Sequence, residues 1–237
     1  MSSKINWWKV LLEIPVIVFS ILLAFVLNAW RDRLNETALE QHYLKELKNE
    51  FLINQSELES DQQFRQDQIG ALNTLIFLSA RDSLDYVSVD SLSRLISYAL
   101  PSRFYSPTEA VLNDLISSGN LGILQSQKLR KLLLEYSVFK SKALILERTE
   151  RKSIEEQLEP YLIENGALMS FGRRKYRHLF PSEGSERQRI NRLLSDRKFL
   201  DILYLRLDRV TVAYNFEVPL GTRMDEILQI IDQELDE

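Results

Sequence analysis

The chain has 237 residues, of which 45% are hydrophobic and 27% are charged, and its formal net charge is −4. This slightly acidic balance argues against a protein that binds nucleic acid through bulk positive charge. The chain has no cysteine, which excludes disulfides, thiolate catalysis and cysteine-ligated metal sites. Its 7 glycines and 6 prolines favour long helices over a many-stranded sheet, because sheets need frequent turns.

The most apolar stretch of the chain lies near the N-terminus. From Val10 to Leu27 it is interrupted only by Glu13, Pro15 and Ser20. About 20 apolar residues, each adding about 1.5 Å of helix, cross the hydrocarbon core of a bilayer. The stretch is longer than the core of a secretory signal, which has about 7–15 residues, so we expect it to be retained as an anchor.

All three tryptophans lie at the two ends of this stretch, at Trp7, Trp8 and Trp30. The helix between the last two would be about 33 Å long, close to the thickness of a bilayer core with its interfaces. Tryptophan favours that interface because its ring is apolar while its N–H needs a polar partner. The sequence therefore predicts a transmembrane helix over 7–30, after a short polar segment, 1–6. The alternative is a buried core helix, which gains nothing from tryptophans at both ends.

The rest of the chain, 31–237, has helical spacing of apolar residues and is expected to form one elongated helical bundle. No proline occurs between 31 and 80, so the membrane helix is expected to continue into a long helix without a turn. The fold class predicted is all-α, with coiled-coil character. The expected helices are 31–80, 90–100, 107–118, 126–164, 186–217 and 223–236.

Proline and capping residues set several of these boundaries. Ser106 followed by Pro107 and Glu109 is typical of a helix start, with Ser106 as the N-cap and Glu109 completing a capping box. Pro160 is expected to bend or interrupt the helix 126–164, and Pro219 is expected to kink or break the chain before the last helix.

Two stretches resemble a known family. The span from Glu13 to Trp30, with its Asn28-Ala29-Trp30 ending, is similar to the start of an uncharacterised bacterial membrane-protein family. The stretch from Leu115 to Leu121, with Tyr136 downstream, is similar to the middle of the same family. The resemblance implies a single span in the bacterial inner membrane, followed by a helical domain outside the cytoplasm. It carries no activity and no functional residue to this chain.

Glu13 is the most unusual residue of the predicted span. An ionised carboxylate at that depth costs a few kcal/mol unless it is paired, hydrogen-bonded or protonated. Four other residues follow it at spacings of four, three, four and four and so lie on the same helix face: Ile17, Ser20, Ala24 and Asn28. Small and polar residues on one face allow two helices to pack closely in lipid, so we expect a helix–helix interface there. Alternatively, Glu13 reaches the headgroups or pairs with a lysine, and the stripe arises by chance.

A basic cluster lies in the least regular part of the chain, at Arg173, Arg174, Lys175 and Arg177. It could bind anionic lipid headgroups or an acidic partner, or it could be a solvated loop. The span should contact membrane lipid and either copies of itself or another membrane protein.

Signals for chemistry are weak in this sequence. The two histidines, His42 and His178, form no metal-binding motif, and no phosphate-binding, dinucleotide or nucleophile motif occurs. We therefore expect no enzyme, no metal and no cofactor. The composition and patterning favour a membrane-anchored binding or scaffold subunit that self-associates or joins a membrane complex. The alternative is a sensory or regulatory subunit, whose bundle binds a ligand and signals through a partner chain.

Overall fold

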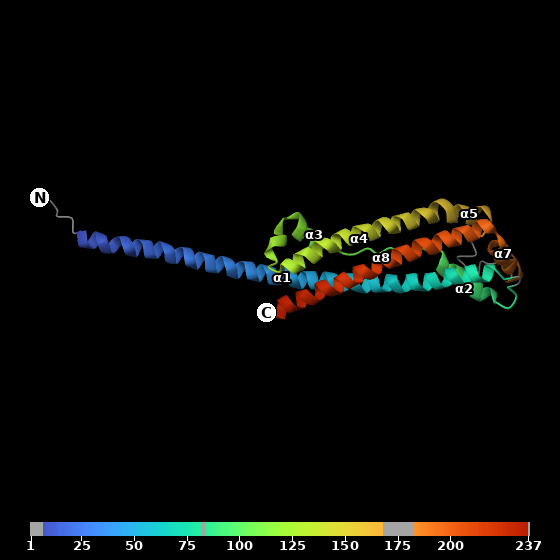
Figure 1. Cartoon of the computed structure of the whole chain (residues 1–237), viewed down its shortest axis with the longest axis horizontal. Helices are drawn as coiled ribbons and strands as arrows, with labels where there is room; N and C mark the ends of the chain where they lie inside the picture. Colours follow the sequence, from blue (N-terminus) through green and yellow to red (C-terminus); the bar gives the residue numbers. More distant parts are fainter. Residues whose placement is uncertain (1–6, 82–83, 168–182, 237) are drawn as a thin grey trace.

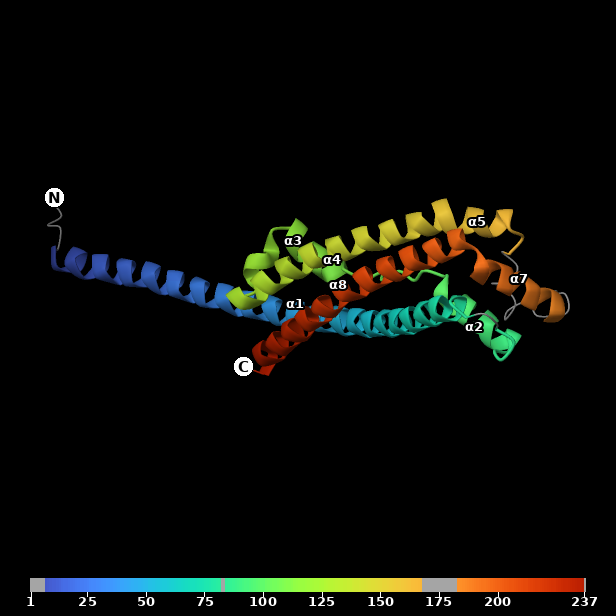
Figure 2. The same cartoon turned by 45° about the vertical axis from the view of Figure 1, so that its right-hand side comes forward.

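The computed structural model describes residues 7–81, 84–167 and 183–236, with side chains described from residue 18 onward. All regular elements in this part of the chain are helices, which confirms the all-α class (Figure 1). They form a long bundle from which one helix projects, with the N-terminus at the far end of that helix (Figures 1 and 2).

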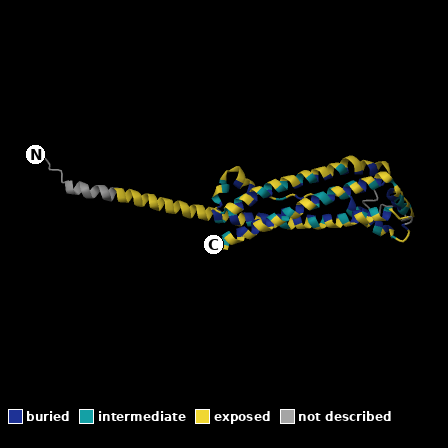
Figure 3. Ribbon diagram, viewed as in Figure 1, coloured by how far each residue is buried: buried dark blue, intermediate teal, exposed yellow. Residues whose placement is uncertain are grey.

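The projecting helix, α1, runs without interruption from Trp7 to Ser79. Its 73 residues correspond to about 110 Å of helix. The residues from 18 to 39 are exposed, and burial begins at Glu40 (Figure 3). The helix therefore has two parts, an exposed arm and a part that is one leg of the bundle.

The chain returns from the far end of α1 through a short helix and an extended segment. Helix α2, Val89–Ala99, packs on α1. Residues 101–109 contain no helix and run back along the bundle to α3, Ala110–Ser117, and the short η1, Asn120–Ile123 (Figure 1). The extended segment thus takes the place that another helix would occupy in a four-helix bundle.

The next leg of the bundle contains a π-helical turn. Helix α4, Gln127–Ser153, is followed by η2, Ile154–Leu158, and α5, Glu159–Glu164. In the π turn the Glu159 N–H donates to the carbonyl of Ile154, five residues back. The next residue, Pro160, has no N–H to donate. The sequence predicted a bend or interruption at Pro160. The structure has a π-helical turn just before that residue, and the helix then continues.

The last leg consists of α7, Glu183–Ser195, and α8, Arg197–Asp236. The break expected at Pro219 does not occur, and α8 continues through it. A proline inside a helix costs about 3 kcal/mol. Leu220, Met224 and Ile227 beyond it are fully buried, and each contributes about 1.5–3 kcal/mol when buried. Packing of the continued helix therefore offsets the cost of the proline.

The three long helices alternate in direction. Gln41 donates to the carbonyl of Glu234, and Gln62 donates to that of Glu217, so α1 and α8 are antiparallel. Arg206 of α8 pairs with Glu150 of α4, while Arg223 lies over the ring of Phe139, so α4 and α8 are also antiparallel. Helix α8 packs against both α1 and α4 and is the central leg.

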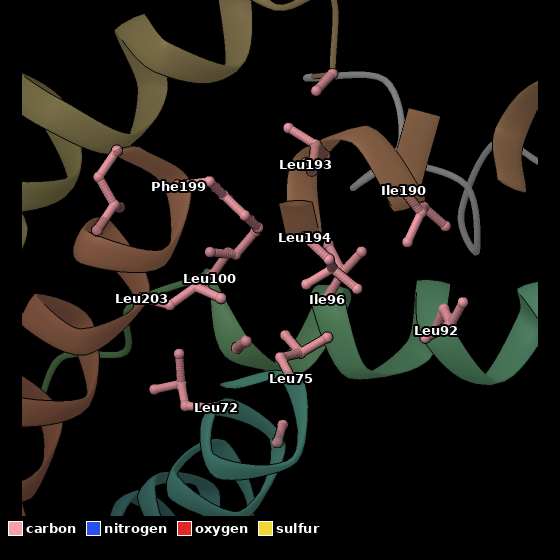
Figure 4. Packing of buried hydrophobic residues seen from close by; sticks show 14 of the residues in the cluster. Leu72, Leu75, Leu92, Ile96, Leu100, Ile190, Leu193, Leu194, Phe199 and Leu203 are labelled. Atoms are coloured by element: carbon pink, nitrogen blue, oxygen red, sulfur yellow. The ribbon is translucent and has the colours of Figure 1, made fainter. Parts of the chain in front are cut away.

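The hydrophobic core consists of two clusters along the bundle. The cluster at the end far from the arm joins α1, α2, η2, α5, α7 and α8, and Figure 4 shows Leu75, Ile96, Leu194 and Phe199 within it. The second cluster joins α1, α3, α4 and the end of α8, and it includes Phe51 with Tyr136 at a ring-centroid distance of 4.9 Å.

Helix α3 begins later than expected, and its N-terminus is capped from another helix. The capping box expected from Ser106 and Glu109 is wrong, because Glu109 makes no capping hydrogen bond with its side chain. Instead, the buried carboxylate of Glu50 accepts from the N–H groups of Val111 and Leu112, at 2.8 and 3.2 Å. A carboxylate at this position satisfies free N–H groups and complements the helix dipole.

The predicted membrane span is not supported by the described part of the chain. In that part, no helix has both the length and the hydropathy of a membrane-crossing segment. The side chains of residues 7–17, which include Trp7, Trp8, Glu13 and Ile17, lie outside the described residues.

The core can be tested with two adjacent leucines of α4. Leu133 is fully buried, whereas Leu134 is 47% exposed. We expect Leu133→Ala to lower the free energy of unfolding by about 2–5 kcal/mol, because it leaves a cavity. Leu134→Ala should change it by less than about 1 kcal/mol. Denaturant unfolding followed by circular dichroism measures both, and equal losses would contradict the packing described.

Candidate functional site

A nearly regular pattern of buried residues along α1 positions the candidate site. Buried residues follow one another at alternating spacings of three and four, which is the repeat of a helical coiled coil. The α1 residues at this spacing are Glu40, Leu44, Leu47, Phe51, Asn54, Leu58, Asp61, Arg65, Gln68, Leu72 and Leu75, and Glu50, Ala71 and Leu78 are buried as well. The polar members concentrate between Asn54 and Gln68. Polar residues therefore interrupt the apolar seam at the junction of the two hydrophobic clusters.

The other two long helices have polar interruptions at the same level. On α4 the buried charged residues are Glu147 and Glu150, and on α8 they are Arg206 and Glu217. Apolar core residues precede and follow the charged ones on α8, and on α4 they precede them while Ile154 and Leu158 of η2 follow. We call Arg65, Glu147, Glu150, Arg206 and Glu217 the buried charge cluster.

Arg65 is the centre of this cluster and contacts all three carboxylates. Its Nε lies 2.5 Å from Glu217 Oε1, and its Nη1 lies 2.7 Å from Glu150 Oε2. Its Nη2 lies 3.6 Å from Glu147 Oε1. The guanidinium is planar and presents its donors in a fixed fork, which allows one side chain of α1 to join α4 and α8.

Arg206 makes a second connection, between α8, α4 and the extended segment. Its Nη1 lies 2.8 Å from Glu150 Oε1, so the two oxygens of Glu150 bind two different arginines. Its Nη2 donates to the carbonyl of Pro101 at 3.0 Å. Arg65 and Arg206 are among the largest fully buried side chains of the described residues.

The extended segment explains why so many polar side chains are buried here. Its backbone groups lack the hydrogen bonds of a helix, and unpaired backbone groups are costly when buried. Asn54 pairs with both the carbonyl and the N–H of Thr108, at 2.7 and 2.8 Å. Gln68 donates to the carbonyl of Pro101 at 2.6 Å, and the N–H of Tyr105 donates to Glu147 at 3.2 Å.

Burial dominates the electrostatics of the cluster. Desolvation raises the pKa of Glu147 to about 7 and that of Glu217 to about 7, although Arg65 attracts both carboxylates. Desolvation also lowers the pKa of Arg206. It acts in the same direction on Arg65, but attraction by Glu217 and Glu150 outweighs it, so the pKa of Arg65 is raised. The Arg65 guanidinium thus serves three carboxylates, and the charges of Glu147 and Glu217 are only partly compensated.

One side of the cluster leads to the surface. Asp61 of α1 pairs with Arg103 of the extended segment at 3.3 Å, and Arg103 is about half exposed. Both residues line a surface pocket of about 390 Å³ with Phe104 and hydroxyl side chains of α1. Burial raises the pKa of Asp61, and the carboxylate has one buried oxygen, Oδ2, without a hydrogen-bond partner in the described structure.

The site residues predicted from sequence lie elsewhere. Ser20, Ala24 and Asn28 are exposed on the arm, and Trp30 is 62% exposed. Glu13, Ile17, Trp7 and Trp8 have side chains outside the described residues, as noted above. The basic cluster of Arg173, Arg174, Lys175 and Arg177 also lies outside the described residues. Within the part of the chain that is described, no group of histidine, aspartate and glutamate is placed to hold a metal.

Sequence reasoning missed the buried charge cluster, although one signal was present. Between Leu58 and Leu72 the seam positions of the long helix are Asp61, Arg65 and Gln68, all polar. A polar run at core spacing inside an apolar seam indicates a buried network rather than a solvated face. The partners on α4 and α8 have no local signature, because their roles depend on how the helices align.

Comparison of the chain with protein-family models, with curated proteins and with solved structures gives no match. The resemblance to a bacterial membrane-protein family therefore stays a prediction.

Removal of Arg65 tests whether the cluster is closed to water. At pH 8, Arg65→Met should lower the free energy of unfolding by about 3–5 kcal/mol, because buried carboxylates lose their common partner. The control is Arg151→Met, which breaks an exposed pair with Glu155 and should cost less than about 1 kcal/mol. Denaturant unfolding measures both variants. An Arg65→Met protein as stable as the control would mean that water solvates these carboxylates.

Proposed function

We propose that the chain is a membrane-anchored helical scaffold or binding subunit, which joins copies of itself or a membrane complex through the arm of α1. The observation that carries this proposal is the exposed apolar surface of the arm. Most of its bulky apolar side chains are about half or more exposed: Val18, Phe19, Ile21, Leu22, Leu23, Phe25, Val26, Leu27, Trp30 and Leu34.

Such a surface is unfavourable in water. Burying one large apolar side chain contributes about 1.5–3 kcal/mol, so ten of them represent a large driving force for association. Monomeric soluble proteins rarely expose a contiguous apolar patch of more than a few hundred Å². The exposed residues also continue the apolar run that begins at Val10. An exposed apolar helix of this kind is most stable in lipid. Trp30 favours the same location, because tryptophan prefers the membrane–water interface.

The continuity of α1 supports a scaffold role. The same helix carries the apolar arm and, from Glu40 onward, the buried seam of the bundle. No loop separates the two parts, so a contact made by the arm is held at a fixed distance and rotation from the bundle. The bundle would then be presented at a defined height above the membrane surface.

Self-association through the arm is the second element of the proposal. Ser20, Ala24 and Asn28 lie on one face of the helix, with Glu13 and Ile17 at the preceding positions of the same stripe. Bulky residues cover the other faces. Close approach of two helices in lipid needs small residues at the contact, and hydroxyl and amide groups can bond across it.

Charged substitutions in the arm test the anchor. The double change Leu23→Arg with Val26→Arg should release the chain from membranes, because each arginine costs about 2.5–3.5 kcal/mol at the centre of a span. The control is Val138→Arg with Ile145→Arg, at two exposed positions of α4. The fraction that stays with membranes after an alkaline wash is measured. Recovery of the unsubstituted chain in the soluble fraction would refute the anchor.

Replacing one small residue of this helix face by a larger one tests self-association. Ala24→Leu should weaken association, because the larger side chain separates the helices. Ala29→Leu is a matched control, since it lies about 140° away around the same helix. The mass of the full chain in a mild detergent, together with a two-hybrid assay in membranes, measures the effect. Equal association of both variants and the unsubstituted chain would exclude this face as the interface.

A further inference from the structure

We propose that the buried charge cluster is a proton-binding site, in which Glu217 takes up one proton and thereby stabilises the junction between the two hydrophobic clusters. The proposal does not depend on membrane anchoring. It concerns the part of the bundle where α1, α4, α8 and the extended segment meet.

The first observation is an imbalance of charge. The cluster has three carboxylates, on Glu147, Glu150 and Glu217, but two guanidinium groups, on Arg65 and Arg206. The adjoining pair of Asp61 and Arg103 adds one charge of each sign and leaves the excess unchanged. An uncompensated charge in a water-poor interior is strongly unfavourable, and binding of a proton removes it.

The second observation is the unequal bonding of the three carboxylates. Both oxygens of Glu150 bind arginines, and Glu147 accepts from the N–H of Tyr105. Glu217 binds Arg65 through Oε1, while its Oε2 is buried and has no hydrogen-bond partner in the described structure. A proton on Oε2 gives a neutral carboxylic acid and leaves Oε1 free to accept from Arg65.

The charged groups that act directly on Glu217 are Asp61 and Arg65 of α1 and Glu147 of α4. The other charged and polar groups of the site bind these neighbours: Arg103 pairs with Asp61, the Tyr105 N–H donates to Glu147, and Glu150 shares Arg65 with Glu217 and also binds Arg206. Among these neighbours, Asp61 and Glu147 disfavour the ionised form of Glu217, whereas Arg65 favours it. The pKa of Glu217 is raised to about 7 because burial outweighs the attraction of Arg65.

The direction of the pH effect follows from this shift. A carboxyl group whose pKa is higher in the folded than in the unfolded state stabilises the fold most below its unfolded pKa, near 4.5. That stabilisation is lost as the pH rises through about 7. We expect the bundle to be more stable in mild acid and less stable above neutrality.

Infrared spectroscopy of the full chain in detergent is the direct test. A carbonyl band of a buried carboxylic acid should be present at pH 5.5, disappear by pH 9, and be missing in Glu217→Gln. Absence of the band in the unsubstituted chain at pH 5.5 would overturn the proposal. So would persistence of the band in Glu217→Gln. The spectrum of the unsubstituted chain decides the matter even if the variant fails to fold.

Thermal unfolding gives an independent readout. The midpoint of the unsubstituted chain should fall by roughly 5–10 °C between pH 5.5 and pH 8. Glu217→Gln mimics the protonated group and should flatten this dependence. Glu226→Gln, at an exposed position on the same helix, should leave it unchanged. An equal pH slope in Glu217→Gln and Glu226→Gln would refute the assignment, as would a flattened slope in Glu147→Gln alone.

Discussion

The structure depends on one constraint, which is an extended segment lying where a bundle would otherwise have a helix. A helix satisfies its own backbone, but residues 101–109 do not, so their carbonyl and N–H groups need partners from other elements. Asn54, Gln68, Glu147 and Arg206 supply them. The apolar seam of the long helices is therefore interrupted at this level, and the hydrophobic core is divided into two clusters.

The charged side chains that meet this need are expensive to bury. Their attraction offsets the loss of hydration only when nearly every donor and acceptor is used. Arg65 achieves this for α1 by contacting carboxylates on α4 and α8 through all three of its nitrogens. Arg206 joins Glu150 to the extended segment, although its buried Nε has no hydrogen-bond partner in the described structure. Because the bonds are directional, the cluster also fixes the alignment of the three helices, which apolar contacts alone specify less strictly. The cluster still has one carboxylate more than it has guanidinium groups, and the proton proposed on Glu217 neutralises that excess charge.

Helix α1 joins this bundle to an exposed arm. Its seam residues from Glu40 onward face protein, whereas the arm before them exposes large apolar side chains (Figure 3). The backbone is α-helical in both parts, and the two parts differ only in their side chains. The arm and the α1 side of the charge cluster are thus parts of one continuous helix.

The sequence by itself determined the helical class, the long first helix and the apolar N-terminal stretch, because these depend on local periodicity and on the scarcity of proline and glycine. Only the tertiary structure decided which polar residues are buried. Asp61 and Arg65 lie at core spacing in the sequence, but their partners are defined only once α4, α8 and the extended segment are placed against them. It also decided that Glu50 caps α3 from another helix and that α8 continues through Pro219. In each case the outcome depends on partners far away in the sequence, and a local pattern does not identify those partners.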